Sequence, residues 1–311
     1  KVGHRYVKNS YEYDKATDLN SATDDFKSLG QGASNPELRT ILGENRIVKW
    51  VSYYATADYN YSSKFYLSAA LSYDGTSALG GKSRFNFYPS LSGAWRLSSE
   101  PFLANSTWID DLKIRASFSQ TGNMNNYAYD YSYLYYRGLK EGNLSVLVRE
   151  AVPNPDMEME KLSSFNLGFD ITLFAQKLNL TLNLFNSMVN NLIVRQKIAP
   201  AYGYTSYYSN SGALRNMGAE FSFNYRSKFN KLTWNIGGSF SYIDNEVTSL
   251  DFILAGEDKI INEVEGINMV TKAGEPLYSY FGLKTMGIFN DNAEASKYTG
   301  PNGQKAKAGD I

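Results

Sequence analysis

Tyrosine is the residue with the strongest claim to binding chemistry in this chain, because it gathers in two short segments. An aromatic face stacks on sugar rings or on apolar side chains, and an adjacent guanidinium can form paired hydrogen bonds with a carboxylate. The candidate ligand-binding residues are Tyr127, Tyr129, Tyr131, Tyr133, Tyr135, Tyr136, Arg137, Tyr202, Tyr204, Tyr207 and Tyr208. The alternative for the first segment is a β-hairpin in which alternating tyrosines pack on their neighbours.

Other reactive residue types are scarce, and their scarcity excludes most catalytic sites. Cysteine is absent, so disulfides, zinc–thiolate sites and thiol nucleophiles are excluded. The only histidine, His4, lies near a polar terminus, which argues against a Ser-His-Asp triad, and a single histidine excludes a multi-histidine metal site. Asp291, Asn292 and Glu294 offer oxygen ligands, but fewer than a hard cation needs, and we interpret them as surface residues. The sequence predicts no enzyme, no metal and no cofactor.

Charge and hydropathy restrict the classes of partner that the chain can have. Lys plus Arg and Asp plus Glu each number 31, so no net charge favours a nucleic-acid partner. No apolar run approaches the roughly 20 residues of a membrane-spanning helix. The mean hydropathy of −0.39 is typical of a soluble protein. It is equally compatible with a transmembrane barrel, because every second residue of a barrel strand is polar.

The elements that position the tyrosines are β-strands. Leu178, Leu180, Leu182 and Leu184 alternate with Asn179, Thr181 and Asn183. A period of two places the leucines on one face of a strand and the polar side chains on the other. Eight such strands are predicted, over residues 51–61, 65–74, 89–97, 112–119, 165–171, 178–184, 217–226 and 232–242.

The links between the predicted strands alternate in length. Those at 62–64, 175–177 and 227–231 are short, whereas those at 75–85, 121–157, 195–213 and 247–274 are long. Short turns on one side and long loops on the other are typical of outer-membrane barrels. The link at 98–110 is the exception, because it is of middling length on the side with short turns. Aromatic residues near strand ends, such as Trp50, Tyr61 and Trp95, fit the aromatic girdles of such barrels.

Several segments together resemble the barrel of SusC/RagA-type TonB-dependent outer-membrane transporters. They begin with Arg84–Leu103 (RFNFYPSLSGAWRLSSEPFL) and Asp111–Asn123 (DLKIRASFSQTGN). Glu160–Phe174, Asn216–Tyr225, Gly274–Phe289 and Gly303–Ile311 follow in the family's order. The resemblance implies an all-β, transmembrane antiparallel β-barrel in the bacterial outer membrane, forming part of a larger barrel of about 22 strands.

The resemblance also implies function and partners. It predicts TonB-dependent import of a nutrient, an oligosaccharide or a peptide. The implied partners are a SusD-like surface lipoprotein as lid, TonB acting through an N-terminal region not in this sequence, and outer-membrane lipid. The alternative is a secreted or surface-bound β-sandwich that binds glycans, which would bury both sheet faces.

The expected domain organisation has three parts. Residues 1–47 are predicted as an extracellular loop region, and residues 48–247 as eight barrel strands with long extracellular loops. Residues 248–311 are predicted as a second extracellular loop region in which the chain is interrupted. Within it, residues 276–289 are expected not to form a spanning strand, because Gly282 and Gly287 break the alternation.

Overall fold

The computed structural model describes most of the chain. The described residues are 1–18, 39–79, 81–123, 136–141, 144–149, 152–199, 201, 203–204, 206–252, 258–282, 284–285, 287–299 and 304–310. The chain folds into two compact units. The first comprises Lys1–Ile260 and Lys272–Leu277, and the second comprises Ile261–Thr271 and Tyr278–Ile311.

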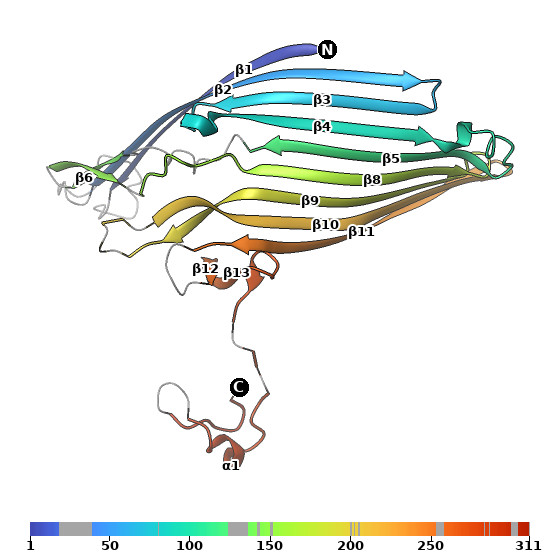
Figure 1. Cartoon of the computed structure of the whole chain (residues 1–311). Coiled ribbons are helices and arrows are strands. Elements are labelled where there is room, and N and C mark those ends of the chain that lie inside the picture. The colour runs from blue at the N-terminus through green and yellow to red at the C-terminus, as the bar shows by residue number, and fades with distance from the viewer. Residues whose placement is uncertain are drawn as a thin grey trace. The chain divides into compact units, whose positions relative to one another are not determined.

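One antiparallel sheet of nine strands dominates the first unit (Figure 1). Its strands are β1 (Val2–Asp18), β2 (Arg39–Tyr61), β3 (Phe65–Thr76), β4 (Phe85–Arg96), β5 (Ile109–Gly122), β8 (Lys161–Leu173), β9 (Leu178–Lys197), β10 (Ser206–Phe229) and β11 (Leu232–Leu250). They pair in the order in which they occur in the chain, and β1 and β11 are the two edges of an open sheet. The all-β fold and all eight predicted strands are therefore confirmed.

Smaller elements complete the fold. β6 (Tyr136–Glu141) and β7 (Leu144–Arg149) form a hairpin between β5 and β8. β12 (Lys259–Val264), β13 (Ile267–Lys272) and β14 (Ser279–Tyr280) form a three-stranded sheet, and α1 (Asn292–Ala295) is a single helical turn. Two 3-10 turns, η2 (Gly81–Arg84) and η3 (Leu97–Ser99), flank β4.

The structure corrects the loop expected at the N-terminus. Val2–Asp18 is a strand, and it pairs with β2 along its whole length, from Val2 opposite Ala55 to Asp18 opposite Arg39. Its sequence lacks a clean alternation, because His4, Lys8 and Ser10 share a face with Val2 and Tyr6. Backbone pairing stabilises a strand whatever its side chains, so a pattern-based reading misses β1.

The predicted strands are longer than expected at the end that carries the long links. β2, β9, β10 and β11 hold 23, 20, 24 and 19 residues. A tilted strand needs only about 9–11 residues to cross a bilayer. The added residues pair beyond the alternating stretch, where neither face has to be apolar.

The pairing register gives the sheet one apolar and one polar face. Residues directly opposite one another in antiparallel strands point to the same side. One row of the apolar face consists of Phe65, Trp95, Ile114, Phe169, Leu182, Phe221 and Phe240. A row of the polar face consists of Arg96, Lys113, Asp170, Thr181, Ser222 and Ser239. The predicted segregation of the leucines and phenylalanines from their polar neighbours is confirmed.

A second layer does not cover the apolar face of the described sheet. Large side chains on it stay open to solvent: Phe87 is 59% exposed and Phe240 is 69% exposed. Fully buried side chains are few, and four of them (Leu79, Tyr88, Met157 and Met159) form one cluster. A β-sandwich, which would bury this face, is therefore not favoured.

The C-terminal part contains no long strand among its described residues. Within residues 276–289, only Ser279–Tyr280 is a strand, and it pairs with β13 alone. The expectation that this segment is not a spanning strand is confirmed for the described residues. Residues 248–311 nevertheless hold β12 to β14 and α1, and their extracellular location stays a prediction.

The two faces predict an asymmetric response to charge. Leu182→Arg in the bilayer-embedded protein should lower the free energy of unfolding by about 2–4 kcal/mol, because it places a cation at mid-height on the face opposite the polar one. Urea unfolding in phospholipid vesicles measures the change. The neighbouring Thr181→Arg points to the other face and serves as the matched control. A larger loss for Thr181→Arg would reverse the assignment of the faces.

Candidate functional site

The polar face of β5, β8 and β9 carries a connected group of charged side chains. The Arg115 guanidinium donates to Asp170 through Nε (2.8 Å) and Nη2 (3.0 Å), and its Nη2 also donates to Asn183 Oδ1 (2.9 Å). Lys113 Nζ lies 3.2 Å from the same Asp170 carboxylate. A Cβ at Gly168 would lie 2.7 Å from the guanidinium, so glycine is needed for Arg115 to lie flat across β8.

Hydroxyl and amide groups fill the rest of this face. Ser90, Ser119, Ser164, Ser187 and Asn216 lie opposite one another on successive strands. Ser164 Oγ and Ser187 Oγ are 2.8 Å apart on this face. Towards the short turns, Arg96 Nε and Ser98 Oγ donate to Asp111 Oδ1. These groups satisfy one another, so the face is a hydrophilic wall.

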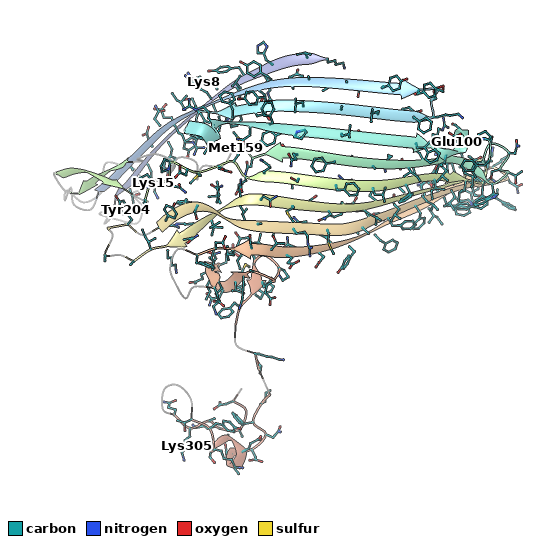
Figure 2. The ribbon with its side chains drawn as sticks, in the orientation of Figure 1. Lys8, Lys15, Glu100, Met159, Tyr204 and Lys305 are labelled. Carbon is teal, nitrogen blue, oxygen red and sulfur yellow. The ribbon has the colours of Figure 1, made fainter. Side chains whose placement is uncertain are left out.

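A short segment lies over the polar face at the end with the long links. We call residues 152–160 the strap. Its Met157 and Met159 are buried against Leu79 and Tyr88, and Tyr88 belongs to the polar face because it lies opposite Ser72. The Tyr88 hydroxyl donates to Met159 Sδ (3.1 Å). Figure 2 labels Met159 at this end of the sheet. The strap therefore forms an ordered ledge on the polar face.

Hydrogen bonds tie the strap to an irregularity shared by β9 and β10. The register between these strands shifts around Gly212, and Asn191 has a φ of 56°. A bulge leaves backbone groups without ladder partners. Asn210 Nδ2 donates to the Asn191 carbonyl (2.8 Å) and to that of Glu158 (2.9 Å), and the Glu158 N–H donates to Asn210 Oδ1 (2.7 Å).

Glu160 is the buried acid of this connection, at 8% exposure. One carboxylate oxygen accepts the Ile193 N–H (2.9 Å), and the other accepts from Asn123 Nδ2 (2.8 Å). Asn154 also binds β10, because its Nδ2 donates to the Tyr208 carbonyl (3.0 Å). The roles of Asn154, Glu158 and Glu160 could not be predicted from the sequence, because these residues lie in a loop and bond mainly to backbone groups.

The structure places the predicted tyrosines as follows. Tyr127, Tyr129, Tyr131, Tyr133, Tyr135 and Tyr202 lie outside the described residues. Tyr136 and Arg137 begin β6, which pairs with β7, and the alternative of a hairpin built from alternating tyrosines stays a prediction. Tyr204 is half-buried just before β10, and Tyr207 and Tyr208 are in β10. The role of all eleven residues in ligand binding stays a prediction.

Tyr207 and Tyr208 do not form one surface. They are adjacent in a strand and so point to opposite sides of it. Tyr208 packs against the buried cluster beneath the strap, whereas Tyr207 pairs with Gln196 and forms a parallel bridge to Val152. Tyr208 therefore contributes to the packing beneath the strap, whereas Tyr204 and Tyr207 are each only partly exposed.

The described residues offer no other chemistry. They hold no group of three or more His, Cys, Asp or Glu side chains that could bind a metal ion. Asp291 Oδ1 caps α1 by accepting the Glu294 N–H (2.8 Å), and Asn292 Oδ1 accepts the Ala308 N–H (2.8 Å). Between β11 and β12, the hydrogen bond from Lys272 lowers the pKa of the Asp258 carboxyl. None of the described helices has the length and apolar character to cross a membrane.

The role of Glu160 leads to a stability prediction. Glu160→Ala should cost about 1–3 kcal/mol, because it removes the buried carboxylate that accepts the part-buried Ile193 N–H. Hydrogen exchange at the Ile193 amide should accelerate accordingly. Glu220→Ala removes an exposed carboxylate from the same sheet and should stay within about 0.5 kcal/mol of the parent protein. Equal effects of the two variants would contradict the assigned role.

Proteins of known family are similar to this chain in sequence. The chain is 28% identical over 282 residues to TonB-dependent receptor P39 of Formosa agariphila, covering 90% of this chain and 26% of that protein. It is 25% identical over 226 residues to TonB-dependent receptor SusC of Bacteroides thetaiotaomicron, covering 68% and 22%. The chain thus spans about a quarter of the length of these curated relatives.

Solved structures share the fold. The RagAB peptide transporter superposes with a TM-score of 0.72 at 22% identity, covering 88% of this chain and 30% of that chain. The outer-membrane transporter YddB of Escherichia coli gives a TM-score of 0.57 at 14% identity, covering 88% and 34%. The family model for the β-barrel of TonB-dependent receptor-like proteins matches residues 2–271. The chain therefore belongs to the TonB-dependent receptor β-barrel family of the bacterial outer membrane and is homologous to SusC and RagA-like transporters.

Proposed function

We propose that the protein containing this chain imports a nutrient across the outer membrane in a TonB-dependent manner. The ligand would be an oligosaccharide or a peptide. The chain would supply part of the barrel wall, with the apolar face towards lipid and the polar face towards the interior. Relatives support the energy source, because P39 and SusC are both described as TonB-dependent receptors.

The observation that carries the proposal is the strap on the polar face. A transporter must hold its ligand at the mouth of the barrel before it passes a hydrophilic interior. Met157 and Met159 of the strap form a buried cluster with Leu79 and Tyr88 at the end with the long links. It is anchored by Glu160 and Asn210, so it provides a fixed base at this end of the sheet.

The polar wall fits passage better than catalysis. Arg115, Asp170 and Asn183 bond to one another, as do Ser164 and Ser187. Polar groups that already bond to one another form a hydrophilic surface that binds a passing ligand only weakly. The chain carries no cysteine and only one histidine, and so it offers no thiol nucleophile and a single imidazole. We therefore infer a carrier.

A SusD-like lipoprotein is the proposed lid over the long links. The RagAB importer has been solved in states named closed-closed and open-open, which supports a cap that moves. RagAB is named a peptide importer, which supports the peptide class. The oligosaccharide class rests on the resemblance to SusC/RagA-type transporters. The tyrosines between β5 and β8 and those near the start of β10 would contact the ligand.

Energised import predicts a separation of binding from uptake. Removing TonB, or collapsing the proton gradient, should abolish accumulation of the nutrient while binding at the cell surface persists. Uptake and surface binding of a labelled oligosaccharide or peptide, measured on the same cells, test this. Undiminished uptake without TonB would reject energised import and favour a passive channel.

The ligand contact can be tested at Arg137. If this guanidinium binds a ligand carboxylate, Arg137→Ala should lower affinity for an acidic peptide by about 10- to 100-fold, as expected for a charge-assisted hydrogen bond. Isothermal titration of the intact protein measures this. Arg226→Ala is the control, because Arg226 lies at the other end of the polar face, near the short turns. Unchanged affinity in Arg137→Ala would remove Arg137 from the site.

A further inference from the structure

Two large apolar side chains interrupt the polar face, and the function proposed above does not use them. Phe185 of β9 and Ile243 of β11 each follow another large residue, so they break the alternation of their strands. The register places both of them opposite Gly218 of β10, in one row across three strands. Gly218 is four residues from Ser222 in an unbroken ladder, so this row lies on the polar face. We call Phe185, Gly218 and Ile243 the apolar spot.

Gly218 allows the Phe185 ring to lie across the neighbouring strand. A Cβ at position 218 would be 2.8 Å from this ring and would overlap the Tyr242 carbonyl oxygen. A larger residue at this position would therefore displace the ring or the backbone of β11. Phe185 is half-buried and Ile243 is 59% exposed. The apolar spot is thus a shallow surface that a ligand on the polar face can reach.

Polar residues border the apolar spot on two sides. The next row towards the short turns consists of Asn183, Glu220 and Ser241, and the next row towards the long links consists of Ser187, Asn216 and Asn245. Amides in both rows already have partners. Asn183 accepts a hydrogen bond from Arg115, and the Asn245 amide donates to Asn216.

Glu220 differs from these neighbours because its carboxylate is open. It is exposed, and no other group of the described residues forms a hydrogen bond or an ion pair with it. In the ladder it is the diagonal neighbour of Phe185, and such residues lie about 7–8 Å apart. A cation is attracted to an aromatic face within about 6 Å of the ring centroid. One cationic group can therefore contact the ring and the carboxylate together.

We propose that the apolar spot and Glu220 bind one lysine or arginine side chain of an imported peptide. The alkyl stem lies on Phe185 and Ile243, and the cationic head binds the Glu220 carboxylate. Lysine and arginine bury their stems on apolar surface while the charge stays in polar surroundings. The inference rests on the proposed import function, and it adds a preference for basic peptides to it.

Charge complementarity favours this occupant over the alternatives. A purely apolar side chain would cover Glu220 without pairing it, and the removal of an unpaired carboxylate from water is costly. A neutral sugar ring would fit the apolar spot, but its hydroxyl groups form weaker hydrogen bonds with the carboxylate than a cation does. Arg115 is already bound to Asp170 and Asn183, so it does not take this role.

A matched pair of peptides tests the charge. One peptide carries a single lysine, and the other carries norleucine at that position, which keeps the stem and removes the charge. The intact protein should bind the lysine peptide about tenfold more tightly, and Glu220→Gln should abolish this preference, as expected for the loss of a charge-assisted hydrogen bond. Isothermal titration measures the four affinities. Asp58→Asn is the control, because Asp58 is another exposed carboxylate on the polar face, opposite Ser68.

The stem is tested by a second variant. Phe185→Ser should weaken both peptides by about fivefold, because both stems lose the same apolar contact. Glu220→Gln, in contrast, should weaken only the lysine peptide. These affinities are measured on the purified protein, so they stand apart from the uptake experiments that test energised import.

Several results would overturn the assignment. One is the absence of a lysine preference in the parent protein, and another is an equal loss of preference in Asp58→Asn. A third is that Glu220→Gln weakens a neutral oligosaccharide as much as the lysine peptide, which would make the spot a sugar site. A fourth is lower thermal stability of the ligand-free Glu220→Gln protein with the lysine preference intact, because it would pair Glu220 with another part of the same protein.

Discussion

The structure depends on the backbone ladder between neighbouring strands. In hydrocarbon every N–H and C=O group must find a partner within the protein, and only a continuous sheet provides this for extended chain. The ladder runs unbroken from β1 to β11, and its register decides which side chains share a face. Arg115 reaches Asp170 and Asn183 only because β5, β8 and β9 are aligned residue by residue. The hydrophilic wall and the apolar face are both consequences of this alignment.

The sequence predicted the sheet wherever burial in lipid imposes a period of two. The leucines of β9 and the phenylalanines of β10 alternate with polar residues, so both strands and the residues that share a face could be identified. β1 could not, because only its residues 2–6 pair with the alternating stretch of β2, and the remainder has no need of apolar side chains. For the same reason the ends of β2 and β10 were predicted too short.

The candidate site was harder to predict than the sheet. Tyrosines are visible as a type, and five of those named lie outside the described residues between β5 and β6. Glu160 and Asn210, in contrast, act on backbone atoms of a bulge, and a bulge follows from pairing that no sequence pattern displays. Tyr208, one of the predicted ligand contacts, packs against the buried cluster, and its contact with a ligand stays a prediction. Residue type alone cannot separate a ring that binds from a ring that supports.

The closure between Asn123 and Glu160 has a consequence for how such proteins diversify. β5 and β8 end their ladder at Gly122 opposite Lys161, and the next residues are joined by the Asn123 N–H to the Glu160 carbonyl (3.0 Å) and by their side chains. These bonds hold the two ends of the intervening stretch together. Lengthening such a loop costs only slowly more entropy, roughly 0.6 kcal/mol for each doubling. Evolution, or an engineer, can exchange the part of this stretch before residue 152 and keep both the strap and the sheet.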